Sequence, residues 1–87
     1  MNEREALIVN PLGLHARPAA QIVRLATSFA SDIRLEKDGM EVNGKSIMGV
    51  MMLSAECGST IRIKADGEDA ERAVDALSKL VAEGFNE

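Results

Sequence analysis

The feature that most restricts the fold of this chain is the alternation of apolar and polar side chains in its short segments. In residues 32–37, Ile33 and Leu35 alternate with charged residues, and residues 60–65 follow the same pattern. Successive side chains of a β-strand point to opposite faces of the sheet, so each of these strands has one apolar and one charged face. Such strands indicate an antiparallel sheet that helices cover on one face only.

Helical periodicity separates these strands along the chain. Apolar residues recur at spacings of three and four over 16–29 and 70–81, and the apolar segment 47–53 follows Ser46, a good helix N-cap. The Asp-Gly pair at 38–39 predicts a hairpin, because both residues tolerate positive φ. The expected strands are 6–9, 32–37, 40–42 and 60–65. This order, β-α-β-β-α-β-α, predicts an α+β fold with a single domain over residues 1–87.

The composition excludes several classes of protein. The 87 residues include one His and one Cys, too few for an internal disulfide or a zinc site. No apolar run approaches the roughly 18–20 residues that span a bilayer. The N-terminus does not resemble a signal peptide, so we expect a cytoplasmic protein without membrane insertion. A net charge of −4 and only two aromatic residues, both Phe, argue against nucleic-acid binding.

The charge is distributed unevenly along the chain. Residues 1–64 carry eight basic and seven acidic residues, whereas residues 65–87 carry two basic and seven acidic ones. The acidic excess therefore belongs to the last helix, where it is typical of a solvated face. The rest of the chain is mildly basic, and Arg17, Arg24 and Lys45 are candidates for one basic patch.

The single histidine stands where a turn leads into a helix. Residues 13–19 read Gly-Leu-His-Ala-Arg-Pro-Ala, and Pro18 suits a first helical turn because its missing N–H costs nothing there. His15 is therefore expected at or next to the N-cap, where free backbone N–H groups favour anions. Together with the Arg17 charge, this favours a neutral, nucleophilic imidazole that can accept a phosphoryl group. The alternative is a surface histidine that only caps the helix.

Two motifs carry a family resemblance. Residues 13–19 resemble the active-site signature of HPr, the histidine-containing phosphocarrier proteins of the bacterial phosphoenolpyruvate-dependent sugar phosphotransferase system. Residues 45–51, Lys-Ser-Ile-Met-Gly-Val-Met, resemble the regulatory serine region of the same family. The resemblance extends over essentially the whole chain, including its length and the order of its elements.

The resemblance implies an open-faced β-sandwich, with four antiparallel strands and three helices on one face. It implies that His15 accepts a phosphoryl group on ring Nδ1 from phosphorylated enzyme I and passes it to a histidine of an enzyme IIA domain. Arg17 is then expected to steady the phosphoryl group, without a metal or other cofactor. The chain is expected to be a monomeric carrier rather than an independent catalyst, because each partner supplies half of the active site.

Ser46 has two compatible interpretations. As an N-cap, its hydroxyl satisfies a backbone N–H of the helix that follows. The resemblance adds phosphorylation of Ser46 by an ATP-dependent HPr kinase/phosphorylase. A phosphate at a helix N-terminus is expected to cause little unfolding, while its negative charge repels acidic partners.

The resemblance also places a docking surface around His15 and the Ser46 helix. Met48 and Met51 are expected to be partly exposed, since a short helix that is apolar almost all round cannot bury every side. The interface is expected to be transient and to bury no more than about 1,200 Å². The predicted partner-binding residues are Arg24, Lys45, Ile47, Met48 and Met51.

Other functions stay open at this point. Leu12 before Gly13 resembles the nitrogen-related branch of the phosphotransferase family, which mostly regulates, whereas Pro18 and the Ser46 segment resemble the sugar branch. A non-carrier interaction domain that acts through the Ser46 helix is a further alternative, although regulatory relatives of that type lack the active-site histidine. RNA-binding modules share part of the element order but need aromatic residues on their strands, and here both Phe residues fall on or beside helices.

Overall fold

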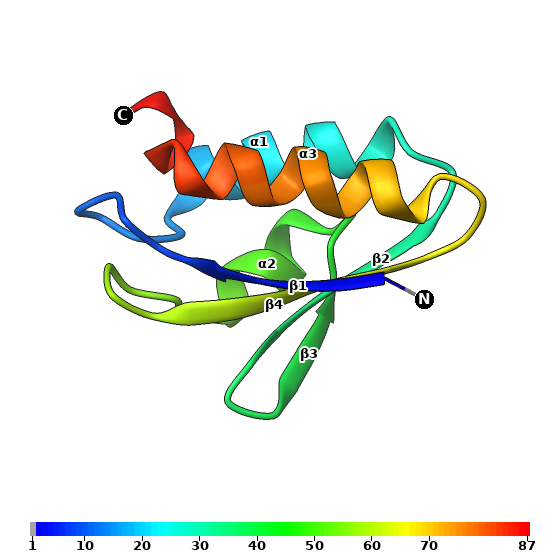
Figure 1. Cartoon of the computed structure of the whole chain (residues 1–87). Coiled ribbons are helices and arrows are strands. Elements are labelled where there is room, and N and C mark those ends of the chain that lie inside the picture. The colour runs from blue at the N-terminus through cyan, green and yellow to red at the C-terminus, as the bar shows by residue number, and fades with distance from the viewer. Residues whose placement is uncertain (1) are drawn as a thin grey trace.

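The computed structural model describes residues 2–87, and its elements follow the predicted order (Figure 1). The elements are β1 (Asn2–Leu7), α1 (Ala16–Thr27), β2 (Asp32–Lys37), β3 (Met40–Asn43), α2 (Ile47–Met52), β4 (Thr60–Asp66), α3 (Ala70–Ala82) and the 3₁₀ turn η1 (Gly84–Asn86). Among these residues, no helix has the length and apolar character needed to cross a bilayer.

The first strand differs from the prediction, which placed it over 6–9. It begins at Asn2 and ends at Leu7. The start is earlier than predicted because the polar residues of this strand have partners of their own. Arg4 forms an ion pair with Asp75 on α3, and Glu5 lies 3.4 Å from the Arg62 guanidinium on β4. A polar strand residue that finds such a partner extends the strand without needing a place in the core.

The four strands form one antiparallel sheet in the order β1-β4-β2-β3. Leu35 on β2 lies between Ile63 of β4 and Val42 of β3. β2 and β3 are joined by the predicted hairpin, where Asp38 and Gly39 have φ values of 52° and 85°. Two consecutive left-handed residues are typical of a tight hairpin turn, whose backbone twist matches that of the paired strands.

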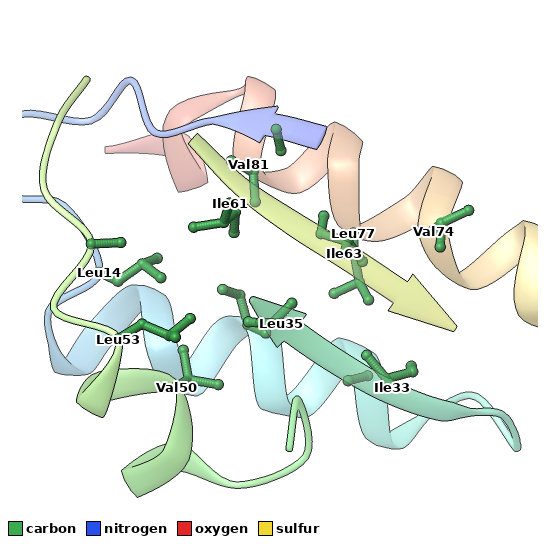
Figure 2. Packing of buried hydrophobic residues seen from close by; sticks show 14 of the residues in the cluster. Leu14, Ile33, Leu35, Val50, Leu53, Ile61, Ile63, Val74, Leu77 and Val81 are labelled. Carbon is green, nitrogen blue, oxygen red and sulfur yellow. The ribbon is translucent and has the colours of Figure 1, made fainter. Parts of the chain in front are cut away.

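The apolar faces of the sheet and the helices meet in one core (Figure 2). α1 and α3 lie side by side over the sheet, and α2 packs against α1 and β3 (Figure 1). The helices therefore cover one face of the sheet and leave the other face open, which confirms the predicted open-faced arrangement. The core residues of the strands are Ile33, Leu35, Ile61 and Ile63, and those of the long helices include Ile22, Val74, Leu77 and Val81.

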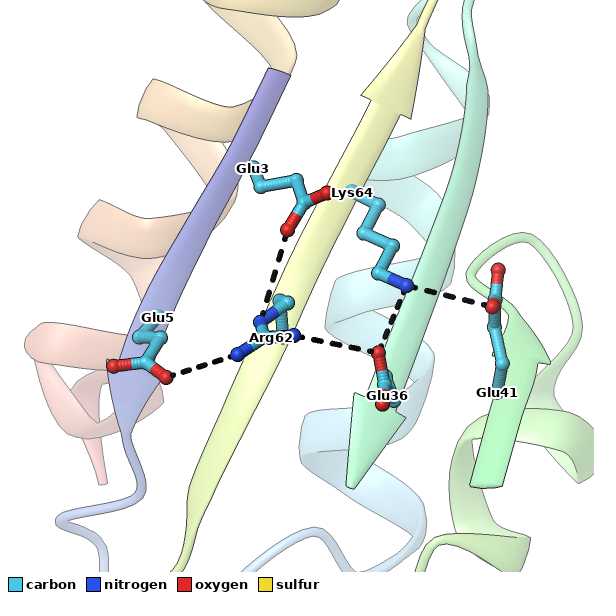
Figure 3. Close-up of polar contacts among 6 residues, drawn as sticks. All are labelled: Glu3, Glu5, Glu36, Glu41, Arg62 and Lys64. Carbon is cyan, nitrogen blue, oxygen red and sulfur yellow. Dashed lines mark hydrogen bonds and ion pairs between the residues drawn. The ribbon is translucent and has the colours of Figure 1, made fainter. Parts of the chain in front are cut away.

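The open face of the sheet carries charged side chains that pair with one another across all four strands (Figure 3). Lys64 Nζ on β4 lies 2.8 Å from Glu36 on β2 and 3.5 Å from Glu41 on β3. The hydrogen bond from Lys64 lowers the pKa of Glu36, and the same bond raises the pKa of Lys64. Arg62 pairs with Glu5 on β1 in the same network. The charged face predicted from the alternation is thus confirmed.

A polar contact joins two loops at the C-terminal end of α1. The Asp69 carboxylate, just before α3, accepts hydrogen bonds from the backbone N–H groups of Ala30 and Ser31 at 2.8 and 3.0 Å, and from the Ser31 hydroxyl. These bonds, with the hydroxyl contributing most, lower the pKa of Asp69 to about 2. The contact fixes the start of α3 against the end of α1, and so helps to set how the two long helices lie over the sheet.

Candidate functional site

His15 is the N-cap of α1, as predicted. Its backbone is extended, with φ −76° and ψ −173°, and its carbonyl oxygen accepts a hydrogen bond from the Ala19 N–H at 3.0 Å. Its imidazole makes no hydrogen bond to the helix, so the side chain itself does not cap α1. Pro18 is buried in the first turn, where a backbone N–H has no partner within the helix, so proline loses no hydrogen bond there. The ring is free for another role, and the side chain is 35% exposed.

The turn before His15 depends on a close backbone approach at Gly13. Gly13 has a φ of +68°, and a Cβ atom there would lie 2.4 Å from the carbonyl oxygen of Ala55. The next residue, Leu14, donates its N–H to that carbonyl at 2.9 Å and buries its side chain in the core. Only glycine fits this geometry. The loop is therefore anchored on both sides of His15, by Leu14 and by the helix.

A carboxylate that the sequence analysis missed lies against the imidazole. Nε2 of His15 is 2.7 Å from Oε2 of Glu87, which follows η1 at the other end of the sequence. The second carboxylate oxygen, Oε1, accepts a hydrogen bond at 3.0 Å from the side-chain amide of Asn10. η1 brings Glu87 to this place because Phe85 is buried and anchors the turn. The bond from Asn10, more than the bond from His15 or the charge of Arg17, holds the pKa of Glu87 below its usual range.

This contact determines which ring nitrogen of His15 is nucleophilic. An ionised carboxylate only accepts hydrogen bonds, so Nε2 of a neutral imidazole carries the proton and donates it to Glu87. The lone pair then belongs to Nδ1, which has no hydrogen-bond partner among residues 2–87. A carboxylate that fixes the tautomer of a histidine also stabilises positive charge when that ring reacts. The geometry thus favours Nδ1 as the nucleophile.

Two arginines lie on the exposed side of α1. Arg17 and Arg24, with Phe85 and Asn86, line a shallow hollow of about 370 Å³ next to the C-terminal turn. Neither guanidinium forms an ion pair with another of the residues 2–87. Arg17 is close enough for its charge to lower the pKa of Glu87. The two guanidinium groups make this hollow positively charged.

The Ser46 helix is a second exposed feature. The Ser46 hydroxyl accepts a hydrogen bond from the Gly49 N–H at 3.1 Å, which confirms its predicted role as N-cap of α2. Met48 is 75% exposed and Met51 41%, so their predicted exposure is also confirmed. The other large apolar side chains exposed on this helix are Ile47 and Met52.

Lys45 has a different environment from that of the two arginines. Its Nζ donates a hydrogen bond to the carbonyl oxygen of Phe29 at 2.9 Å, and the residue is half-buried. The amine thus already has a partner at the end of α1. The structure brings Arg17 and Arg24 together in one hollow and ties Lys45 to the loop after α1.

Comparison with known proteins identifies the family. A family model described as the PTS HPr component phosphorylation site matches residues 2–83. The chain belongs to the HPr family. Members of this family act as phosphocarriers of the phosphotransferase system, as the names of the relatives below state.

Individual HPr relatives cover the whole chain. The phosphocarrier protein HPr of Cupriavidus necator is 47% identical over 87 residues, which is 100% of this chain and 98% of that protein. The crystal structure of an HPr from Thermoanaerobacter tengcongensis has 46% identity and a TM-score of 0.96, and it covers 100% of this chain and 98% of its own. Crh, the Bacillus subtilis catabolite repression protein, is 43% identical with a TM-score of 0.78 over 95% of each chain, and its crystal structure is a domain-swapped dimer.

Within this HPr-family site, sequence motifs identified the residues that lie close to His15 along the chain. They missed Asn10 and Glu87, which are 77 positions apart. No local pattern marks either residue, because one is a loop polar residue and the other one of many acidic residues near the end of the sequence. Only the folded C-terminal turn brings them together.

Proposed function

We propose that this chain accepts a phosphoryl group on Nδ1 of His15 from phosphorylated enzyme I and passes it to a histidine of enzyme IIA domains in sugar uptake. The observation that carries the proposal is the contact between Nε2 of His15 and Glu87 at 2.7 Å, which leaves Nδ1 as the nucleophile. The site fits such a carrier because it is exposed and its two arginines have no ion pair among residues 2–87. We propose that the carrier acts in the cytoplasm.

The transfer step follows from the arrangement of charges. The Nδ1 lone pair forms a bond to phosphorus, and the bond between phosphorus and the donor atom of enzyme I breaks, with that electron pair staying on the donor. The imidazole gains positive charge while its proton stays on Nε2, and the Glu87 carboxylate offsets this charge. Arg17 offers a forked, permanently charged donor to the phosphoryl oxygens. Onward transfer to a IIA histidine is the same step in reverse.

The chain alone has half of an active site. The His15 side chain is 35% exposed, so residues 2–87 leave the ring open to solvent and do not enclose a phosphoryl group. The partner therefore has to exclude water and align the donor atom, the phosphorus and Nδ1. The exposed Met side chains of α2 suit such contacts, because a flexible thioether side chain adapts to more than one partner surface.

A labelling experiment tests the proposal. The chain is incubated with enzyme I and labelled phosphoenolpyruvate, and the label is expected to be stable in alkali and lost in acid, as a phosphoramidate is. His15→Ala is expected to remove the label completely, while Ser46→Ala is expected to keep it. Absence of label with an enzyme I that phosphorylates another HPr would refute the carrier function. Transfer of the label to IIA domains then completes the test.

Regulation at Ser46 is the second part of the proposal. The Ser46 hydroxyl lies at the N-terminus of α2 and half-exposed, so a kinase could reach it, and a phosphate there keeps an acceptor for the Gly49 N–H. The phosphate adds negative charge beside the exposed methionines, which weakens docking of acidic partners. HPr kinase/phosphorylase and ATP are expected to give an acid-stable label. If Ser46→Ala is labelled equally, the assignment of the modified residue is wrong.

The nitrogen-related branch is a second candidate because of one residue. Leu12 precedes Gly13 in the active-site loop and is 74% exposed, so it is available to a partner that docks over His15. The two branches are separated by measuring onward transfer to a sugar-type IIA domain and to a nitrogen-type IIA domain under the same conditions. Faster transfer to the sugar-type domain supports the proposal, and faster transfer to the other assigns the chain to the regulatory branch.

A purely regulatory domain that acts through α2 is the third possibility. The likeness to Crh favours it, whereas a free Nδ1 on His15 favours a carrier. The same labelling experiment decides, because a regulatory domain takes label only at Ser46. The oligomeric state is a separate question, and sedimentation at micromolar concentration is expected to show a monomer.

A further inference from the structure

Asn10 is a buried polar residue that touches the site without touching His15. It is only 2% exposed, and its side-chain nitrogen donates two hydrogen bonds. One goes to the Gly13 carbonyl oxygen at 2.8 Å, in the loop that leads to His15. The other goes to Oε1 of Glu87 at 3.0 Å, while Oε2 of the same carboxylate lies 2.7 Å from Nε2 of His15. The amide thus joins both sides of the site.

We propose that Asn10 is a positioning residue for phosphoryl transfer, which acts by holding Glu87 so that this carboxylate keeps the proton of His15 on Nε2 and directs the Nδ1 lone pair outward. This inference rests on the proposed carrier function, since it assigns a role in that same step. Glu87 is the group that contacts the reacting ring, and Asn10 acts through it.

The orientation of the Asn10 amide follows from its partners. Both the Gly13 carbonyl and the Glu87 carboxylate only accept hydrogen bonds, so only the NH₂ side of the amide can face them. The other side, Oδ1, is buried and has no hydrogen-bond partner among residues 2–87. A buried acceptor without a partner is unfavourable for stability. The arrangement therefore serves the position of Glu87 better than it serves the stability of the loop.

The causes of the lowered pKa of Glu87 support the same role. The hydrogen bond from Asn10 is the largest cause of the lowered pKa of Glu87, ahead of the bond from His15. The hydrogen bond and the charge of His15 act in the same direction, so both residues help to keep this side chain ionised. When the Asn10 amide holds one oxygen of the ionised Glu87 carboxylate, the other oxygen is directed at the ring of His15. The Glu87 side chain then loses less conformational freedom when the ring becomes charged.

A neutral amide suits this position because it holds the carboxylate without neutralising it. A Lys or Arg in place of Asn10 would pair with Glu87 and reduce its stabilisation of the charged ring. An Asp there could not donate a hydrogen bond and would repel Glu87. The choice of a neutral donor at residue 10 therefore matches the need for a carboxylate whose negative charge stays available to His15.

The first measurement is the tautomer of His15 in the unphosphorylated chain. The ¹⁵N chemical shifts of the ring are recorded at a pH where the imidazole is neutral, in the wild type, Asn10→Ala, Glu87→Gln and Glu83→Gln. The wild type is expected to be predominantly Nε2–H, and both Asn10→Ala and Glu87→Gln are expected to increase the Nδ1–H population. Glu83→Gln is the matched control, because this exposed residue has no ion pair among residues 2–87 and its loss removes the same charge from the C-terminal segment.

The second measurement is a double-mutant cycle on the rate of phosphorylation by enzyme I. Asn10→Ala is expected to lower kcat about tenfold when Glu87 is present, and to have no further effect in the Glu87→Gln background. Equal effects of Asn10→Ala in both backgrounds would show that it acts through the Gly13 loop, and would overturn the inference. An unchanged tautomer in Asn10→Ala would do so too.

The two measurements separate this inference from the proposed function. A chain that enzyme I does not phosphorylate at all contradicts the carrier function, but the tautomer of its neutral histidine can still be measured. If the Asn10→Ala variant is phosphorylated at the wild-type rate, the inference about Asn10 is contradicted, but the carrier function is not. Thermal unfolding of each variant shows whether a lower rate comes from lost structure.

Discussion

The open face of the sheet and the His15 end of the molecule use charged side chains in opposite ways. On the sheet, Arg62 and Lys64 pair with carboxylates on the neighbouring strands (Figure 3). At the His15 end, Arg17 and Arg24 have no ion pair among residues 2–87. A paired charge has little left to offer a partner, whereas an unpaired guanidinium is available to a phosphate or an acidic protein. The total charge of a chain is thus a poor guide to its binding face.

The largest difference in rate is expected between two single variants, each of which removes one cation from one of the two surfaces. Arg17→Ala should lower the rate of phosphoryl transfer about a hundredfold, because it removes a charged donor from the reacting group. Arg62→Ala removes the same charge from the open face and should leave the rate unchanged. Initial rates of label transfer from enzyme I measure both. If the two variants lose activity equally, net charge and not local pairing controls the reaction.

A second pair of variants compares exposed methionines. Met48→Ala on α2 should raise the KM for enzyme I about tenfold at unchanged Tm, because an exposed side chain contributes to docking and not to the core. Met40→Ala on β3 is the matched control, since Met40 is also exposed, at 46%, but lies at the hairpin. A higher KM for Met40→Ala would extend the docking surface to the sheet.

A third prediction concerns the contact that joins α1 and α3. The pKa of Asp69 is about 2 in the folded chain and has its ordinary value of 3.8 when the chain is unfolded. The folded state therefore binds the proton less tightly, so this carboxylate stabilises the fold above about pH 4, and the contribution is lost as the pH falls from about 4 toward 2. Asp69→Asn should be less stable than the wild type at pH 7 and equally stable near pH 2.

Urea unfolding at several pH values between 7 and 2 checks this expectation. Glu68→Gln, an exposed neighbour, serves as the control and should follow the wild type throughout. A difference between the wild type and Asp69→Asn that stays constant over the whole range would mean that ionisation of Asp69 does not stabilise the fold. Phosphoryl transfer at pH 7 should be little changed as long as the variant is folded, since the contact lies at the opposite end of α1 from His15.

The smallest effect is expected on the open face. Glu36→Gln removes one carboxylate from Lys64 and should lower the Tm by about 3 °C at low salt. High salt should reduce the difference, because it screens exposed ion pairs. Differential scanning calorimetry at two ionic strengths measures both effects. A large loss of stability would show that this network, and not the apolar core, holds the strands in register.

Local patterns in the sequence predicted most of the fold. Alternation over 32–37 and 60–65 and the two helical stripes depend only on residues close together in the chain, and the structure confirms the elements they indicate. The first strand was misplaced for the same reason, because its polar half is held by Asp75 and Arg62 far along the sequence. A pattern of neighbours has no information about such partners.

The candidate site divides in the same way. His15, Arg17 and Ser46 lie in short motifs, so neighbouring residues predicted the N-cap positions of His15 and Ser46, and the family resemblance of the motifs predicted the roles of all three. The contact of Glu87 with His15 joins residues 72 positions apart, and the bond from Lys45 to the Phe29 carbonyl depends on where a loop passes. Long-range polar contacts of this kind depend on the packing of the core, which brings distant chain segments together.

The position of the C-terminal turn has a practical consequence for handling the protein. Glu87 touches His15. Asn2, at the start of β1, pairs with Ala65 near the end of β4, and the two ends of the chain lie far apart (Figure 1). An affinity tag or fluorophore attached next to Glu87 would lie beside His15 and is expected to hinder any protein that docks over this histidine. Labels, tags and surface attachment therefore belong at the N-terminus, where they leave the histidine accessible to its partners.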